Sequence, residues 1–409
     1  TSSEPREIAE LNGWSETTEQ LQGARSMSRL LGSSRRIHIL GLNGVGLFVA
    51  HSLAGLPNRP PISLLAHTIT SVTQWERNGR TIEVTTDGLP VSRGNMDIEL
   101  FRLNDQGSFT DQPTTQGQEQ SVSSQAASND LPINVLVVAS RASFVVKTLS
   151  AIKHRLHRES TILFLQDGMG VIEAVNAEVF LDIDTRPDYV VGLCLHGIST
   201  RRSPFKLVHA TLGTTALAAL PHYANADSGN ATQSMNTTTR YLLRTLTRTP
   251  ALVAAGYSYL DVFQSQLEKL VETAVIDSLT AVLDCPVHRL LHNSSSSRTM
   301  RMLLAEMSLV ICSLPELQSA SNVRTRFSPA RLEKLVVLAA KRRLHLQGHG
   351  NASEIDYLNG YIVRRGESLG VQCVVNYTLM QIMKAKWRVA KLEASEGTPW
   401  TGSTLWEED

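Results

Sequence analysis

A short apolar strand that leads directly into a glycine-rich turn is the feature that most constrains how this chain can fold. The strand pattern covers residues 36–40, and the turn is Gly41-Leu42-Asn43-Gly44-Val45-Gly46. Apolar residues then recur at helical spacing over 47–56, and a second strand pattern follows at 62–66. A strand, a turn, a helix and a strand in this order predict the first right-handed unit of a parallel sheet with helices on both faces.

The turn contains two of the three glycines of the dinucleotide-binding pattern G-x-G-x-x-G. Gly41 would make the tight turn, and Gly46 would let the helix pack closely on the strand. Asn43 stands where the second glycine lets the backbone approach a pyrophosphate, and Gly44 beside it could shift that approach by one position. We therefore expect these four residues to bind a dinucleotide, with an empty or altered Rossmann-like site as the alternative.

Patterns over the whole chain of 409 residues indicate two domains. Strand patterns resume at 133–138, 161–165 and 189–193, whereas from about residue 240 the apolar residues recur at helical spacing. The stretch 104–130 is rich in Gln, Ser, Thr, Asn and Asp, so it cannot bury enough apolar surface to offset the entropy of ordering. The predicted fold class is α/β, with an N-terminal Rossmann-type doubly wound sheet followed by an all-helical C-terminal domain.

The same patterns give the expected boundaries. The predicted segments are a polar N-terminal extension at 1–34, a Rossmann-like dinucleotide-binding domain at 35–222 with a disordered insertion at 104–130, a polar linker loop at 223–239, a helical domain at 240–395 and a tail at 396–409. Within the helical domain, the clearest amphipathic stripes are at 263–284, 299–318, 328–346 and 353–369.

Charge and cysteine content exclude several classes of protein. Because 39 Lys and Arg oppose 38 Asp and Glu, the net charge is +1, and we expect no direct binding of nucleic acid. The four cysteines form no CxxC pair and no residue spacing resembles a metal site, so we expect neither a disulfide framework nor a bound metal.

No apolar run reaches the roughly 18 residues that span a bilayer. We expect an intracellular protein, in the cytoplasm or, since the chain begins at Thr1 and a removed leader stays open, in the mitochondrial matrix.

Four ordered segments resemble the ketopantoate reductase (2-dehydropantoate 2-reductase) family, in particular its fungal branch. They are residues 37–52, 164–170, 269–286 and 354–361. The resemblance implies an N-terminal Rossmann domain that binds NADP as NADPH, and a helical domain of the 6-phosphogluconate dehydrogenase C-terminal type that closes over it. It also implies reduction of the 2-oxo acid 2-dehydropantoate to (R)-pantoate, a step in pantothenate and coenzyme A synthesis.

The resemblance assigns catalysis to Lys269 and Glu354. Lys269, Thr273 and Asp277 follow one another at steps of four, so a helix would place them on one face, apart from its apolar stripe. An ammonium there can stabilise the negative charge that hydride delivery places on a carbonyl oxygen, and it can supply the proton. Glu354 could orient Lys269 or accept hydrogen bonds from substrate hydroxyl groups. The alternatives are a solvated helix lysine and a first-turn glutamate stabilised by a helix N-terminus.

Several positions depart from the family's pattern in ways that change charge or shape. Asp167 replaces an asparagine and Arg141 replaces a lysine, both along the expected nucleotide site. Thr273 and Asp277, at the expected substrate-binding positions, replace two asparagines. A carboxylate about 4 Å from an anionic 2-oxo acid, at an effective dielectric of about 20, would weaken its binding by about 4 kcal/mol.

Two further departures concern arginines and the cofactor. A serine pair expected before Glu354 falls near Arg342-Arg343, which would offset the added carboxylates if either pointed inward. We interpret both arginines as a basic, solvated helix end. After the second strand, His67-Thr68 provides neither the acidic residue that binds NAD nor the arginine that binds the 2′-phosphate of NADP.

Two functional hypotheses follow. The first is an NADPH-dependent oxidoreductase that reduces a small 2-oxo acid in the cleft between the domains, with Lys269 as the general acid and Glu354 as its partner. The rival is a non-catalytic paralog that keeps the fold as a binding or assembly module in a larger complex. A homodimer is compatible with either hypothesis.

Overall fold

A computed structural model describes residues 35–103, 131–200, 203–221, 235–343 and 352–396. The predicted extension at 1–34, the predicted insertion at 104–130 and residues 397–409 of the predicted tail lie outside the described residues.

Eight strands form the main sheet, in the order β12-β11-β8-β7-β6-β1-β2-β5. The strands from β8 to β5 are parallel, with Ile37 of β1 opposite both Ile62 and Val135, and β11 is antiparallel to β8. This is the doubly wound order expected for a Rossmann-type sheet. The strands are β1 (Ile37–Leu40), β2 (Ile62–Ala66), β5 (Asp97–Leu100), β6 (Val135–Val138), β7 (Thr161–Phe164), β8 (Asp188–Cys194), β11 (Thr215–Ala219) and β12 (Ala254–Gly256).

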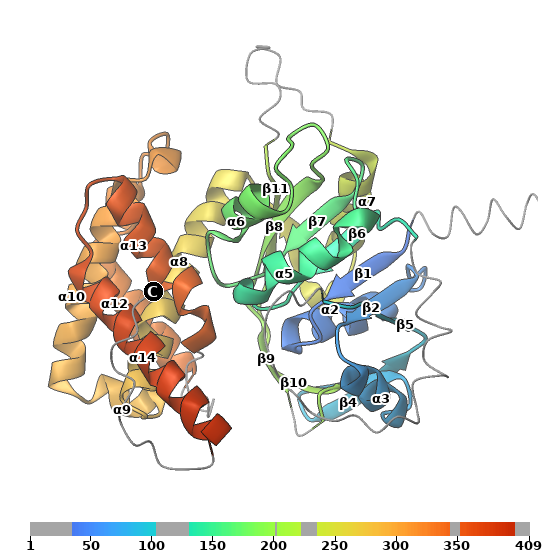
Figure 1. The fold of residues 1–409 in the computed structure, drawn as a ribbon, viewed down its shortest axis with the longest axis horizontal. Coiled ribbons are helices and arrows are strands. Elements are labelled where there is room, and N and C mark those ends of the chain that lie inside the picture. The colour runs from blue at the N-terminus through green and yellow to red at the C-terminus, as the bar shows by residue number, and fades with distance from the viewer. Residues whose placement is uncertain (1–34, 104–130, 201–202, 222–234, 344–351, 397–409) are drawn as a thin grey trace, which may run out of the picture.

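Helices cover both faces of this sheet. Figure 1 shows α5 (Ala142–Ile152) and α6 (Val171–Glu178) side by side on one face, where their apolar residues pack on Leu40, Leu136 and Val138. On the other face, α2 (Gly44–Ala54) and α7 (Thr237–Thr247) pack on the alternate residues of the same strands. Short α3 (Ile69–Arg77) contributes the buried Trp75. The predicted fold class is confirmed.

A second, four-stranded sheet covers the outer side of α2 and was not predicted. Its order is β4-β3-β10-β9, and it encloses α2, in which residues 46–53 are all buried. A helix that is apolar on every side must be covered on every side, so the run of apolar residues after Gly46 was the available signal. The strands are β3 (Thr81–Thr86), β4 (Leu89–Gly94), β9 (Gly197–Thr200) and β10 (Lys206–Thr211).

Two elements before residue 257 belong to the sheet. α7 packs its Leu242 and Leu246 into the core behind the sheet, and β12 pairs with β11. The helical bundle therefore begins with α8 at Tyr259, whereas the predicted boundary is at residue 240. Of the predicted linker loop at 223–239, residues 223–234 lie outside the described residues, and α7 begins at Thr237. The helical spacing of α7 does not show which core it packs into, and this ambiguity explains the difference.

The helices from α8 onward form a second body beside the sheet (Figure 1). Leu270, Val271 and Ala274 of α8 pack against Leu303 and Met307 in its core. The predicted stripe at 353–369 is broken at Leu358 into a 3-10 helix and α13. The helices are α8 (Tyr259–Val282), α9 (Val287–Leu291), α10 (Ser294–Cys312), α11 (Val323–Arg326), α12 (Pro329–Arg342), η5 (Ala352–Tyr357), α13 (Asn359–Ser368) and α14 (Val374–Glu396).

Candidate active site

The glycine turn at the end of β1 has the close packing that a dinucleotide site requires. Gly41 has φ +111°, and a Cβ at this residue would lie 2.3 Å from the backbone nitrogen of Ser140. A Cβ at Gly46 would lie 2.0 Å from the carbonyl oxygen of Gly41. The turn is thus pressed against the end of β6, at the point where the strand order reverses and Rossmann folds bind their ligands.

Asn43 has a structural role in this turn. It is the N-cap of α2, where its Oδ1 accepts a hydrogen bond from Gly46 N (3.0 Å), and its Nδ2 donates to the carbonyl oxygen of Ala139. This arrangement leaves the N–H groups of Gly44 and Val45 as the first two donors of the helix, which is a common setting for a pyrophosphate. The turn therefore fits a dinucleotide, although Asn43 itself faces the protein.

The turn gives a prediction with an internal control. Gly46→Ala is expected to weaken NADPH binding about tenfold or more and to lower the melting temperature, because its Cβ would meet backbone at 2.0 Å. Gly256→Ala, in β12 at the edge of the sheet and away from the turn, is the control, since its Cβ would meet no atom within 4 Å. Titration of NADPH by fluorescence compares the two variants, and equal affinities would contradict the role given to the turn.

Lys269 lies where α8 passes the carboxyl edge of the sheet. α8 packs against β8 and β11, and Cys194 ends β8. Burial raises the pKa of the Cys194 thiol, Asp167 adds to the rise, and the charge of Lys269 opposes it. The ion pairs that α8 makes among the described residues go through Glu268 and Asp277 and do not include Lys269. Its ammonium is therefore near the sheet edge and not committed to a carboxylate there.

Asp167 and Arg141 follow the ends of β7 and β6, and both are exposed. The charge of Asp167 acts on Cys194 and also on Asp277 of α8, so it reaches across to the helical bundle. Arg141 precedes α5 and makes no side-chain cap. The structure thus brings Asp167 near Lys269 and Asp277, whereas Arg141 lies beside Glu354.

Glu354 joins the two bodies of the protein. Its carboxylate accepts hydrogen bonds from Ala142 N and Ser143 Oγ, both at 3.2 Å, at the N-terminus of α5. Burial raises the pKa of this carboxyl, and these hydrogen bonds with the charge of Arg141 oppose the rise. Glu354 therefore lies in the first turn of its own 3-10 helix, η5, and caps a helix of the sheet domain, as in the alternative of a glutamate stabilised by a helix N-terminus. Among the described residues, no hydrogen bond or ion pair joins it to Lys269.

Arg343 was interpreted from sequence as solvated, and the structure corrects this. Its Nη1 donates to Asp277 Oδ1 (3.0 Å) and its Nη2 donates to Thr273 Oγ1 (3.5 Å). Arg342 does stay exposed, with its Nε near the carbonyl oxygen of Leu338. The sequence did contain a signal for this pair. Two positions depart from the family's pattern with opposite charges, an arginine in place of a serine and Asp277 in place of an asparagine, and opposite charges favour an ion pair.

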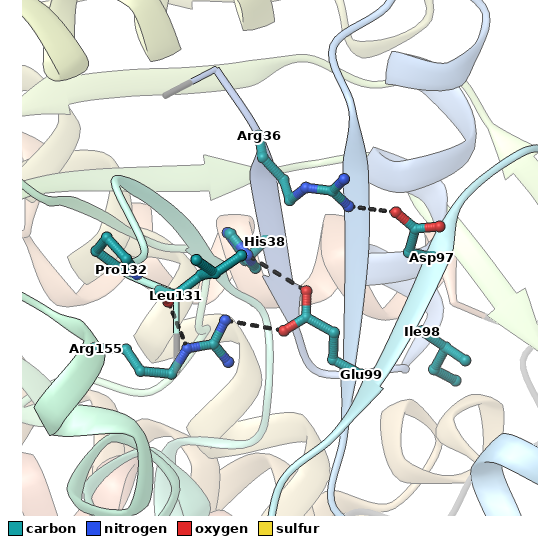
Figure 2. A pocket seen from close by; sticks show the side chains of 8 residues that line it. All are labelled: Arg36, His38, Asp97, Ile98, Glu99, Leu131, Pro132 and Arg155. Carbon is teal, nitrogen blue, oxygen red and sulfur yellow. Dashed lines mark hydrogen bonds and ion pairs between the residues drawn. The ribbon is translucent and has the colours of Figure 1, made fainter. Parts of the chain in front are cut away.

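A second polar cluster lies at the opposite, amino edge of the sheet, around a cavity of about 210 Å³ (Figure 2). Glu99 lies between two basic side chains, with its Oε2 3.0 Å from Arg155 Nη2 and its Oε1 3.5 Å from His38 Nε2. Arg36 pairs with Asp97 and donates to Ser63 Oγ. Because Lys269 acts at the other edge, this cavity is separate from the candidate active site.

Within the described residues, no group of three or more His, Cys, Asp or Glu side chains is placed to hold a metal ion. His196 and His209 are buried and contact each other through their ring nitrogens (3.0 Å). In the same part of the chain, no helix combines the length and the apolar character needed to cross a membrane.

Two family models match the chain. The one described as "Ketopantoate reductase PanE/ApbA" matches residues 37–222, and the one described as "Ketopantoate reductase PanE/ApbA C terminal" matches residues 261–387. The first match spans the sheet up to β11, and the second starts just after α8 begins.

Similar proteins carry different names. A "Probable 2-dehydropantoate 2-reductase" of Schizosaccharomyces pombe is 24% identical over 363 residues, which are 86% of this chain and 96% of that protein. The "Cytochrome B translational activator CBS2" of Saccharomyces cerevisiae is 24% identical over 300 residues, 64% of this chain and 76% of that protein. A solved D-mandelate dehydrogenase, with NADH and anilino(oxo)acetate, has a TM-score of 0.59 at 15% identity and covers 87% of this chain and 99% of its own.

Proposed function

Because this chain belongs to the ketopantoate reductase family, we propose that it reduces a small 2-oxo acid with a nicotinamide dinucleotide as the hydride donor. The observation that supports the proposal best is the position of Lys269, whose charge acts on Cys194 at the carboxyl edge of the sheet. Relatives named as 2-dehydropantoate 2-reductases favour 2-dehydropantoate as the substrate and (R)-pantoate as the product.

The chemistry needs few groups. The turn of Gly41, Gly44 and Gly46 would hold a reduced nicotinamide dinucleotide, which would supply the hydride for the C2 carbonyl carbon of the acid. The ammonium of Lys269 would donate a proton to the carbonyl oxygen, so that the C=O group becomes CH–OH. The positive charge of Lys269 would also stabilise the oxygen while its negative charge develops. Solvent then returns a proton to the lysine.

The cofactor proposed is NADP, bound as NADPH. Gly41, Gly44 and Gly46 would admit the pyrophosphate at the start of α2, and Asn43 would hold the turn in shape. The residues after β2 do not discriminate between the two dinucleotides, since His67 is exposed and Thr68 caps α3. Family membership therefore supports NADPH, and a direct comparison with NADH is part of the test.

The test follows NADPH or NADH consumption with 2-dehydropantoate and with other small 2-oxo acids. The proposal expects turnover of at least one acid, together with thermal stabilisation by the cofactor, which amounts to about 2.7 kcal/mol at a concentration of 100 times Kd. No stabilisation by millimolar NADPH or NADH, together with no turnover, would rule out the reductase.

A second candidate function is a non-catalytic binding or assembly module in a larger complex. The observation that favours it is the engagement of Thr273 and Asp277 by Arg343, because both residues belong to the expected substrate site. The relative named as a translational activator shows that the family's sequence pattern extends to a protein with a different name. Homodimerisation and the compartment stay predictions under either function.

A further inference from the structure

Arg343 places a guanidinium over the same face of α8 that carries Lys269. It caps the end of α12, and its two terminal nitrogens contact Asp277 and Thr273, which are one helical turn apart. The Arg343 and Asp277 side chains are 20% and 32% exposed, so the pair is partly buried but reachable. A cation therefore lies beside Thr273 and Asp277 of α8, held mainly by its 3.0 Å contact with Asp277.

Within the part of the chain that the structure describes, the Arg343 guanidinium has more N–H groups than acceptors. It carries five N–H groups in a planar fork, and among the described residues its acceptors are Asp277 Oδ1 and Thr273 Oγ1. The Thr273 contact, at 3.5 Å, is at the long limit for a hydrogen bond, so it is easily exchanged. An incoming carboxylate can take the Nη2 side of the fork while Asp277 keeps the Nη1 side.

The charges of Lys269 and Arg343 act on the same two carboxyl groups, Glu272 and Asp277, so the two cations lie near each other. Thr273 is four residues after Lys269, so their side chains are neighbours on α8, and the Nη2 atom of Arg343 lies beside Thr273. In a 2-oxo acid the carboxylate is bonded directly to the carbonyl carbon. If Lys269 acts on the carbonyl oxygen, the carboxylate comes next to the position of Arg343.

The surrounding charges explain why an arginine is needed here. Burial raises the pKa of Asp277, while the charges of Arg343 and Lys269 oppose the rise and that of Asp167 adds to it. Burial also raises the pKa of Glu272, and the charges of Lys269, Arg343 and Arg342 oppose that rise. Together with Asp167 and Asp277, Glu272 makes three carboxyl groups near the site, which would repel an anionic substrate unless a second cation were present. Arg343 supplies that cation, and Asp277 fixes its direction.

We propose that Arg343 binds the carboxylate of the 2-oxo acid and that Asp277 is the positioning residue for its guanidinium. This inference rests on the proposed function and deepens it, because it makes the free carboxylate the recognised group. The site then prefers a 2-oxo acid over the ester of the same acid, in which the charge is absent. Thr273 contributes to the resting position of Arg343.

The experiment measures 3-methyl-2-oxobutanoate and its ethyl ester side by side. In Arg343→Gln, KM for the acid is expected to rise about tenfold or more, while kcat/KM for the ester stays within about twofold of wild type. Arg342→Gln is the matched control and should change neither. Asp277→Asn removes a repelling carboxylate as well as the group that orients Arg343, so a rise in KM for the acid with kcat unchanged is the result expected of a positioning residue, and a fall in KM would overturn that role. Arg343→Lys, which keeps the charge without the fork, should restore part of the loss in Arg343→Gln.

A binding experiment distinguishes a failure of this inference from a failure of the proposed function. Calorimetric titration of the oxo acid analogue oxamate into the protein with NADPH asks whether a carboxylate binds, whatever the turnover. Binding to wild type that Arg343→Gln abolishes, without turnover of any acid, would retain the inference and remove the reductase. Equal KM values for the acid in wild type and Arg343→Gln, or equal losses for acid and ester, would overturn the inference. So would the absence of oxamate binding to wild type.

Discussion

A Lys269→Ala variant is expected to lose about a hundredfold or more in kcat for the reduction of 2-dehydropantoate, since it removes both the proton donor and the charge that stabilises the carbonyl oxygen. Binding of NADPH is expected to be unchanged, because the glycine turn that would hold the pyrophosphate lies at the end of β1 and not on α8. Steady-state rates and a fluorescence titration of NADPH measure the two properties separately.

Two variants make this result specific. Lys334→Ala removes an exposed lysine from α12 in the same helical bundle, and it should leave kcat unaltered. Lys269→Arg keeps the charge but holds its proton too tightly to donate it well, so its kcat should fall between those of wild type and Lys269→Ala. If Lys269→Ala and wild type reduce the acid equally fast, another group is the acid.

Five of the eight strands of the main sheet, β1, β2, β6, β7 and β8, could be predicted from sequence because their signals are local. Buried parallel strands such as β1 and β2 are short apolar runs, and the glycine turn between β1 and α2 is contiguous. The small sheet was missed because its strands mix buried and exposed residues, and because its central pair joins Glu83 of β3 to Lys206 of β10. No local pattern records a pairing between segments so far apart in the chain.

The same reason limits what the sequence says about the site. The turn residues and the line of Lys269, Thr273 and Asp277 follow from periodicity within one element. The partners of Asp277 and Glu354 cannot be predicted in this way, because Arg343 is 66 residues from Asp277 and Ala142 is 212 residues from Glu354. Charge is visible in the sequence, but the direction of a long side chain depends on tertiary packing.

Acid is expected to destabilise this protein partly through Glu99, at the edge of the sheet opposite the active site. Burial would raise the pKa of this carboxyl, but hydrogen bonds from His38 and Ser63, with the charges of His38 and Arg155, outweigh burial and lower the pKa to about 2. Because the folded-state pKa is below the unfolded one, the stabilisation is complete above the unfolded value and is lost as pH falls toward 2. The loss amounts to about 3 kcal/mol.

Comparison of Glu99→Gln with wild type isolates this contribution. The variant should be less stable at neutral pH, because Arg155, whose side chain is 5% exposed, would keep a buried charge without its counter-ion. It should then lose less stability than wild type between about pH 5 and about pH 2, since the titrating group is gone. Glu76→Gln, at an exposed pair with Arg80, is the control and should follow wild type. Calorimetric melting across this range decides the matter, because parallel curves for wild type and Glu99→Gln would mean that the pKa of Glu99 is the same in the folded and the unfolded protein.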